Sequence, residues 1–561
     1  MWNSSFPSRR LVLASGAAAL GGSLLGWPLS ALAADQPPLT ADGSFTRATV
    51  TEIARALSKA AYAPPSQALP APVANLSYDE YHSIAYRPEA AVWTKSGLPF
   101  ELQFFHRGAF YKDKIEVAVV DANGIAHHIV YSPTMFASTH ALPQPLPSDD
   151  IGFAGLRILG RVNQPDVFDE VAVFEGASYF RSLGKGEVYG ISARGLALKV
   201  GAQDGEEFPI FRAFWMETPA KGSDSITVHA LLDSKSVTGA YRFAIRPGLP
   251  TVIDVETTLF PRVDLVAPGI AVGTSMFFFS GNGRDNVDDW RPEVHDSDGL
   301  LMVNGLGERL WRPLTDPKNL QFSGFVDSGP RGFGLMQRNR DFGSYQDFEA
   351  DYEKRPCLWI EPVGDWGRGS VVLVEIPSAS EANDNIVAYW QPADQIKGGS
   401  EFSYAYRMFW GNGPGLPGAI VASTRQGRAD AKKADAVRRF VIDFVTPAGV
   451  NGGANQPAPA AAAVPVPTTP SAAATVIQAA ATAASAADPS PATDPVPDPR
   501  PVVTASSGMI TDIGLEPNPV TGGWRLAFNL DPQKSGLVEL RAELRFSDRR
   551  PVDTWLYRWT A

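Results

Sequence analysis

Cysteine is almost absent from this chain of 561 residues, in which Cys357 is the only one. A single cysteine excludes an intrachain disulfide and any metal site built on several cysteines. The sequence also has no Walker loop, no dinucleotide fingerprint following a strand and no His-Glu-x-x-His motif. Nucleotide and zincin chemistry therefore have no support, and we expect neither a cofactor nor a metal.

A basic excess is also lacking. The 49 Lys and Arg residues are outnumbered by 60 Asp and Glu residues, which gives a net charge of −11. Nucleic-acid-binding proteins usually carry a basic surface, so we expect no nucleic-acid partner. The 44% of hydrophobic residues is enough to form a large core, which excludes a wholly disordered chain.

Long apolar runs are missing except near the start of the chain. Residues 1–33 combine Arg9-Arg10, an apolar stretch and the small residues of Ala31-Leu32-Ala33. This pattern predicts a cleaved twin-arginine export signal and a periplasmic location; the alternative is a general secretory signal that happens to contain two arginines. Gly21-Gly22 and Pro28 interrupt the apolar stretch, so we expect no stable membrane anchor.

Helical periodicity is scarce as well, and Thr51–Tyr62 is the main example. Alternation of apolar and polar residues is common instead, as in Phe100–Phe104 and Ile115–Val119, and it is typical of half-buried strands. Short runs of this kind are separated by turn residues up to about residue 410. We predict an all-β fold in which residues 34–412 form a large antiparallel β-sandwich with a concave sheet face.

The chain beyond residue 412 differs in composition. Residues 451–500 consist mostly of Ala and Pro with Thr and Ser, a composition that predicts disorder. One strand precedes this tract, and several strand-like runs follow it. We therefore predict an immunoglobulin-like sandwich over residues 413–561 with the tract inserted in it; the alternative is a linker before a third domain.

Two polar stretches stand out, 288–299 and 381–390, with a pair of tryptophans in the stretch 359–367 between them. Structural explanations exist for both: a solvated acidic loop anchored by Trp290, and an Asn/Asp turn between strands. Aromatic rings beside acids, amides and arginine are also what sugar recognition needs, since rings stack on C–H faces and polar groups bond hydroxyls. The candidate sugar-binding residues are Trp290, Arg291, His295, Asp298, Trp359, Trp366, Asn383 and Asn385.

Many segments of the chain resemble the family of osmoregulated periplasmic glucan biosynthesis proteins G and D. The similar segments are Gly152–Arg157, Phe174–Arg181, Ser192–Ala197, Leu231–Ser234, Thr238–Tyr241, Asp289–Leu300, Trp311–Leu314 and Glu381–Trp390. The resemblance extends from about residue 40 to 447 and resumes after 501. The twin-arginine signal makes the chain look most like the D branch. The departures are the Ala/Pro-rich tract and Cys357, which replaces a small polar residue.

The resemblance implies a galactose-mutarotase-like sandwich followed by an immunoglobulin-like domain. Family members shape the β-1,2-linked glucose backbone of periplasmic glucans, and some are endo-β-1,2-glucanases that invert the anomeric centre. Carried over by motif, Asp384 would be the general acid and Asp296 the general base, kept ionised by a positive neighbour such as Arg291. Proton transfer in the family is thought to be indirect, so the pair need not show the usual inverting separation of roughly 6.5–9.5 Å.

Other functions stay open at this point. A sugar hydroxyl in place of water would give transglycosylation or cyclisation of the glucan. A non-catalytic protein could bind β-1,2-glucan and present it to a membrane glucan synthase with the same cluster of aromatic and acidic residues. A mutarotase-like epimerase is less favoured, because nothing in the sequence points to free monosaccharides.

Overall fold

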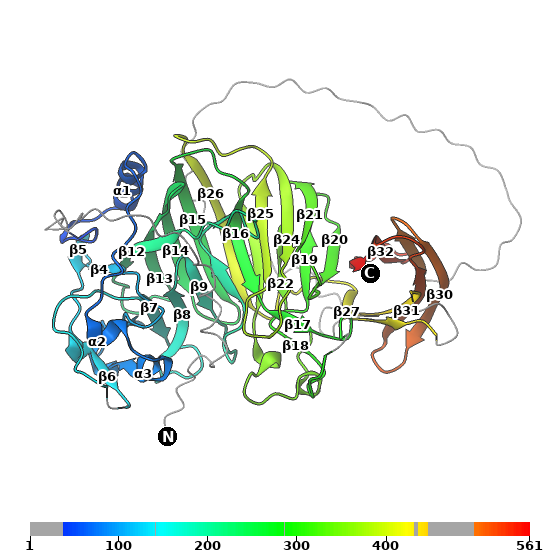
Figure 1. Ribbon diagram of the computed structural model, residues 1–561, viewed down its shortest axis with the longest axis horizontal. Helices are drawn as coiled ribbons and strands as arrows, with labels where there is room; N and C mark the ends of the chain where they lie inside the picture. Colours follow the sequence, from blue (N-terminus) through cyan, green and yellow to red (C-terminus); the bar gives the residue numbers. More distant parts are fainter. Residues whose placement is uncertain (1–37, 141, 285–286, 431–435, 447–498) are drawn as a thin grey trace, which may run out of the picture.

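The computed structural model describes residues 38–140, 142–284, 287–430, 436–446 and 499–561. The predicted export signal, and all but the last two residues of the Ala/Pro-rich tract, lie outside these ranges. Strands dominate the described residues, and the longest described helix is α1 (Thr49–Ser58). The all-β prediction is therefore confirmed (Figure 1).

The first of two large sheets has fifteen strands. In spatial order they are β1 (Gly43–Ser44), β5 (Ile125–His128), β4 (Glu116–Val120), β12 (Ile210–Glu217), β13 (Ile226–Asp233), β14 (Val237–Arg246), β15 (Thr251–Pro261), β26 (Phe402–Gly411), β23 (Cys357–Val363), β22 (Gly332–Met336), β19 (Gly299–Val303), β20 (Arg309–Pro313), β33 (Thr554–Thr560), β32 (Leu537–Arg545) and β29 (Arg500–Ala505). Two of its pairings are parallel, β4 with β12 and β20 with β33.

The second large sheet is antiparallel and has ten strands. Its order is β21 (Gln321–Ser328), β24 (Arg368–Glu375), β25 (Ile386–Pro392), β16 (Pro268–Ser275), β10 (Ser192–Arg194), β9 (Tyr179–Ser182), β8 (Asp169–Glu175), β7 (Gly155–Gly160) and β3 (Phe100–Phe105), with β11 (Ala197–Leu198) beside β16. Phe174 and Phe180 of this sheet pack edge-on against Phe243 of the first. The two sheets thus enclose one core, and the predicted large β-sandwich is confirmed.

Alternation along the strands determines which side chains leave this core. On β9, Phe180 is buried in the core between the sheets. Its neighbours Tyr179 and Arg181 therefore lie on the opposite, outer face of the ten-stranded sheet, because successive side chains of a strand point to opposite faces. The same rule places Ser192 and Arg194 of β10 on that outer face, around Ala193 in the core.

The N-terminal segment covers the outer face of the other sheet. Helix α1, predicted over Thr51–Tyr62, packs Val50 and Ala54 in a separate core with Trp215. The remaining small elements are α2 (Ala71–Ala74), α3 (Tyr78–His82), η3 (Pro88–Ala90), η4 (Pro133–Met135), η5 (Phe342–Ser344), η6 (Tyr352–Lys354), the pair β2 (Ile84–Tyr86) and β6 (Phe136–Ser138), and the pair β17 (Phe277–Phe279) and β18 (Val294–His295).

The C-terminal strands form a second sandwich. One of its sheets is β27 (Ile420–Arg428), β28 (Arg438–Val445), β31 (Gly523–Asp531) and β30 (Met509–Asn518), and the other is β29, β32 and β33. Four strands facing three is the arrangement of an immunoglobulin-like domain. Phe440, Phe528 and Trp555 pack between the two sheets.

This second sandwich is not a separate body on a linker. Because β33 pairs with β20, the fifteen-stranded sheet runs from the large sandwich into the C-terminal one. Trp311 and Trp359 of the large sandwich are buried in the C-terminal core. The two sandwiches therefore share a sheet, and the C-terminal core includes side chains from the large sandwich.

Candidate functional site

Asp296 lies between β18 and β19, near the junction of the two sandwiches, and is only 2% exposed. Its main chain is fixed by a hydrogen bond of 2.8 Å from its N–H to the Met276 carbonyl. Nη1 of Arg355 donates a hydrogen bond to the Asp296 carboxylate oxygen Oδ1. Arg355 is held in turn by the Ala350 carbonyl, 3.1 and 2.9 Å from Nε and Nη2, and by the Tyr352 ring, 4.2 Å below the guanidinium.

The electrostatics of Asp296 involve a second carboxylate. Burial raises the pKa of Asp296, the Arg355 guanidinium opposes that rise, and the negative charge of Asp384 adds to it. The carboxylate of Asp384 is therefore near enough to act electrostatically on Asp296. These are the two aspartates that the resemblance predicts as a catalytic pair.

Asp384 reaches this position because its loop, between β24 and β25, is locked by the next residue. The Asn385 amide donates to the Phe277 and Ile376 carbonyls at 2.9 and 3.1 Å and accepts from the Phe277 N–H at 2.8 Å. Asp384 then lies 4.0 Å from Arg181 Nη2 on the outer face of the ten-stranded sheet. Asn385, predicted to bind sugar, is buried and holds the backbone instead.

Arg291 joins three loops around the pair. Its guanidinium lies 2.7 Å from Asp289, 2.9 Å from Asp347 and 2.8 Å from Glu381. The hydrogen bond with Asp289 is the largest of the effects that raise the pKa of Arg291 above its usual value. The cation that contacts Asp296 is thus Arg355, not Arg291 as the sequence suggested.

Tyr352 contacts two of the charged residues near the aspartate pair. Its hydroxyl donates to Glu381 at 2.9 Å, and its ring carries Arg355. Sequence reasoning missed Tyr352, Arg355 and Arg181. The signals were weak: a short charged run, Asp-Tyr-Glu-Lys-Arg at 351–355, and an arginine on a strand in one of the segments that resemble the family.

His295 and Asp298, also predicted to bind sugar, lie behind Asp296 in the protein interior. His295 is fully buried, with its ring nitrogens 2.9 Å from Gln337 and 3.2 Å from Glu293. Burial disfavours the imidazolium, yet the bond to Glu293 holds the pKa of His295 above its usual value. Burial raises the pKa of Asp298 to about 6, and its Oδ2 accepts two backbone N–H groups. Both side chains hold the loop through these contacts.

The predicted tryptophans are dispersed. Trp290 is 69% exposed beside Arg291 and is available to a ligand, as is the exposed Asn383 next to Asp384. Trp359 is 3% exposed and belongs to the C-terminal core, with its indole N–H bonded to Glu361. Trp366, in the turn between β23 and β24, packs on Trp390 of β25, and its indole N–H donates to the Ala405 carbonyl. Since β23 spans about 20 Å, Trp366 is far from Arg355 at the opposite end.

Glu175, at the end of β8, is a further polar group on the outer face of the ten-stranded sheet. Its neighbours include the charges of Arg181 and Glu170 and the ring of Tyr111. Burial raises the pKa of Glu175 to about 8, against the opposing charge of Arg181. In the folded protein at neutral pH this carboxyl group is therefore mostly protonated.

Replacing Glu175 with Gln is expected to change how stability depends on pH. A carboxyl whose pKa is about 8 when folded and 4.5 when unfolded favours folding fully below pH 4.5. That contribution disappears as the pH rises through 8, and glutamine cannot lose a proton. Between pH 4.5 and 8 the wild type should therefore lose stability that the Glu175→Gln variant keeps. Urea titrations should show this as a rise, with pH, in the free energy of unfolding of the variant relative to that of wild type. Glu89→Gln, at an exposed position, is the control, and equal slopes for both variants would contradict the prediction.

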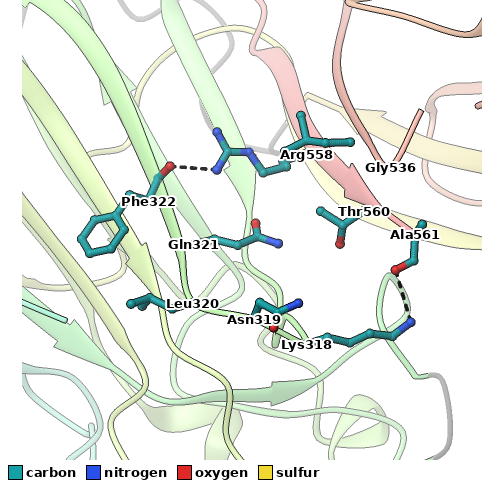
Figure 2. A pocket seen from close by; sticks show the side chains of 10 residues that line it. Lys318, Asn319, Leu320, Gln321, Phe322, Gly536, Arg558, Thr560 and Ala561 are labelled. Carbon is teal, nitrogen blue, oxygen red and sulfur yellow. Dashed lines mark hydrogen bonds between the residues drawn. The ribbon is translucent and has the colours of Figure 1, made fainter. Parts of the chain in front are cut away.

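A cavity of about 350 Å³ lies elsewhere, between residues 318–322 and the end of the C-terminal sandwich (Figure 2). Its cations bond to neighbouring backbone: Lys318 Nζ lies 3.3 Å from the Ala561 carbonyl, and Arg558 Nη1 2.8 Å from the Phe322 carbonyl. None of the predicted site residues lines it. The aspartate pair and this cavity are separate features.

Within the described ranges, no three His, Cys, Asp or Glu side chains are grouped so that they could hold a metal ion. None of the helices in these same ranges is long and apolar enough to cross a bilayer.

Comparison with known proteins gives the family. The model of the periplasmic glucan biosynthesis protein family MdoG matches residues 45–487 and 476–559. The chain belongs to this family. Glucans biosynthesis protein G of Vibrio cholerae serotype O1 is 51% identical over 520 residues, which cover 92% of this chain and 87% of the relative. The protein G of Shewanella baltica is 50% identical over 528 residues, 94% of this chain and 89% of the relative.

Both of these MdoG-family relatives carry the G name, so the likeness to the D branch still rests on Arg9-Arg10 alone. Among solved structures, a galactose mutarotase related enzyme from Lactobacillus acidophilus matches 46% of this chain and 94% of its own, at 8% identity and a TM-score of 0.20. A likeness of that size carries no argument, and the fold assignment depends on the sheets described above.

Proposed function

We propose that this member of the MdoG family acts in periplasmic glucan biosynthesis by cleaving β-1,2-linked glucan internally with inversion at the anomeric carbon. The observation that carries the proposal is that Asp384 and Asp296, on two separate loops, interact electrostatically and share a cation: Arg181 lies 4.0 Å from Asp384, and its charge also acts on Asp296. Glycoside hydrolysis requires one acid and one base of this kind.

In the proposed reaction, a water molecule attacks the anomeric carbon while the bond from that carbon to the glycosidic oxygen breaks. Asp384 supplies the proton that the departing oxygen needs, and Asp296 accepts the proton that the water loses, directly or through a hydroxyl or ordered water. After the reaction the pair still holds one proton, but on Asp296 instead of Asp384. Release of that proton to solvent and uptake of another by Asp384 restore the starting state.

The surrounding arginines have distinct tasks in this scheme. Arg355 favours the ionised form of Asp296, which the burial of that carboxyl opposes. Arg181, bonded through Nε to Ser192 at 2.6 Å, orients the carboxylate of Asp384 from the sheet side. Trp290 and Asn383, both exposed near the pair, are the residues we propose to contact sugar rings and hydroxyls.

Incubating the purified protein with linear β-1,2-glucan tests the proposal. We expect shortened oligosaccharides, with newly formed reducing ends initially in the α configuration by NMR. Redistributed chain lengths with an unchanged total of reducing ends would instead show transglycosylation. A ring product, whose mass is one water below that of a linear chain of the same length, would show cyclisation. Binding without any product would show a glucan-binding protein, and it would refute the glucanase proposal.

A further inference from the structure

A series of buried contacts connects the C-terminal sandwich to the segment that carries Asp296. It begins at Asp553, which directly precedes β33 and is 1% exposed. One of its carboxylate oxygens lies 2.8 Å from Arg309 Nη2, and the other 2.8 Å from Arg338 Nη1. The Val421 N–H donates to the second oxygen at 3.1 Å. One carboxylate of the C-terminal sandwich thus compensates two guanidinium groups of the large sandwich, that of the buried Arg309 and that of Arg338, whose side chain is 10% exposed.

Arg338 is the next link, in the loop that follows β22. Its Nη1 donates to the Val421 carbonyl at 2.6 Å, and its guanidinium lies 3.6 Å above the ring of Trp311. Two of these three partners, Asp553 and Val421, belong to the C-terminal sandwich. The position of the Arg338 side chain is therefore set largely by that sandwich.

The backbone of the same loop holds Asp298. The N–H groups of Arg338 and Asn339 donate to Asp298 Oδ2 at 3.1 and 3.3 Å, and the Asp298 N–H donates to the Met336 carbonyl at 2.8 Å. Asp298 is only two residues from Asp296. Between them, the fully buried Ser297 is bonded to Ser275 at 2.6 Å. A shift of the loop would therefore displace the segment around Asp296, because closely packed interiors transmit strain.

We propose that Asp553 is a positioning residue for Asp296, an inference that rests on the function proposed above. Through Arg338 and the backbone of the loop, the C-terminal sandwich fixes the carboxylate that accepts the proton. The immunoglobulin-like unit is then part of the catalytic apparatus, although it supplies no group that touches the sugar.

Asp553→Asn tests this idea, because it keeps the shape of the side chain and removes the charge that Arg309 and Arg338 share. Loss of the charge should let Arg338 and its loop move. Since misplacing a catalytic group by about 1 Å can reduce turnover roughly 100-fold, we expect kcat on β-1,2-glucan to fall by about tenfold or more, with KM within about twofold of wild type. Amide hydrogen exchange at residues 338 and 339 should become faster.

Asp443→Asn is the matched control. Asp443 is also a buried acid of the C-terminal sandwich. It is paired with Arg525 at 2.8 Å and Arg425 at 3.3 Å, and both of these arginines belong to the same sandwich. It should lower stability without changing kcat or the exchange of residues 338 and 339. Equal effects of the two variants on kcat, or unchanged exchange in Asp553→Asn, would overturn the proposal.

Two further measurements keep the idea testable. If Asp553→Asn does not fold, Arg338→Met breaks the same link and leaves the Asp553–Arg309 pair neutral, and the same results are expected. If wild-type protein cleaves no β-1,2-glucan, the glucanase proposal fails by itself. The exchange comparison between the two Asp→Asn variants then still decides whether Asp553 holds the loop: faster exchange in Asp553→Asn alone supports the link, and equal exchange refutes it.

Discussion

Asp384→Asn should reduce the turnover of β-1,2-glucan by about 1,000-fold or more while glucan binding stays largely intact. Asparagine has nearly the shape of aspartate but no proton to give to the departing oxygen, and general acid–base catalysis contributes roughly 10²–10⁴-fold per group. The loop itself should not move, because Asn385 and its bonds to Phe277 and Ile376 are untouched. Reducing-end assays give the rate, and calorimetry with glucan gives the affinity.

The choice of substrate makes this test specific. A β-1,2-linked disaccharide with a dinitrophenyl leaving group needs no proton for departure, so Asp384→Asn should lose far less activity on it than on glucan. Asp394→Asn serves as the control, since Asp394 is an exposed acid beyond the other end of β25. Normal glucan turnover by Asp384→Asn would exclude Asp384 as the acid.

Asp296→Asn should have an effect of similar size for a different reason. It removes the proton acceptor and leaves the buried Arg355 without its counter-ion, so both turnover and stability should fall. We expect kcat to drop by about 100-fold or more, on glucan and on the dinitrophenyl substrate alike, because attack by water is needed in both. The acidic limb of the pH profile of kcat/KM should also disappear.

Stability loss and loss of the base must be separated here. Asp233 offers a matched control: it is 1% exposed and bonded to Arg212 and Arg262, at 2.6 and 2.9 Å, and neither arginine belongs to the site. Asp233→Asn should destabilise the protein to a similar degree and still cleave glucan. If both variants lose activity equally, Asp296 has only a structural role.

The sequence predicted the strands well because their signal is local. On β3, Phe100, Leu102 and Phe104 lie in the core, and this alternation can be read from a few residues. The pairing of β20 with β33 has no local signal. Leu310 and Thr554 pair only because the second sandwich packs against the first, and nothing in the sequence of either segment indicates this pairing.

The candidate site shows the same difference between residues with a local sequence signal and residues without one. The resemblance predicts Asp296 and Asp384 from motifs, whereas Arg355 and Arg181 are recognised only through contacts made in three dimensions. Trp359, in contrast, is a residue that the sequence predicts at the site and the structure places in a core. Its position beside acids predicts a sugar site, but the first half of β23 lies where two cores meet, so the successive side chains from Cys357 to Ile360 are all buried. Composition alone does not distinguish an aromatic platform for sugar from a core residue.

The shared sheet also bears on how the protein acquires its fold. On the ribosome, β20 is made long before β33, since its partner residues 310 and 554 are separated by most of the second half of the chain. Until β33 arrives, β20 presents an open strand edge, and such edges favour association between chains. Pairing between distant segments is also slow, because a long loop must close first. Chaperone capture should therefore be strongest for nascent chains that contain β20 but not yet β33.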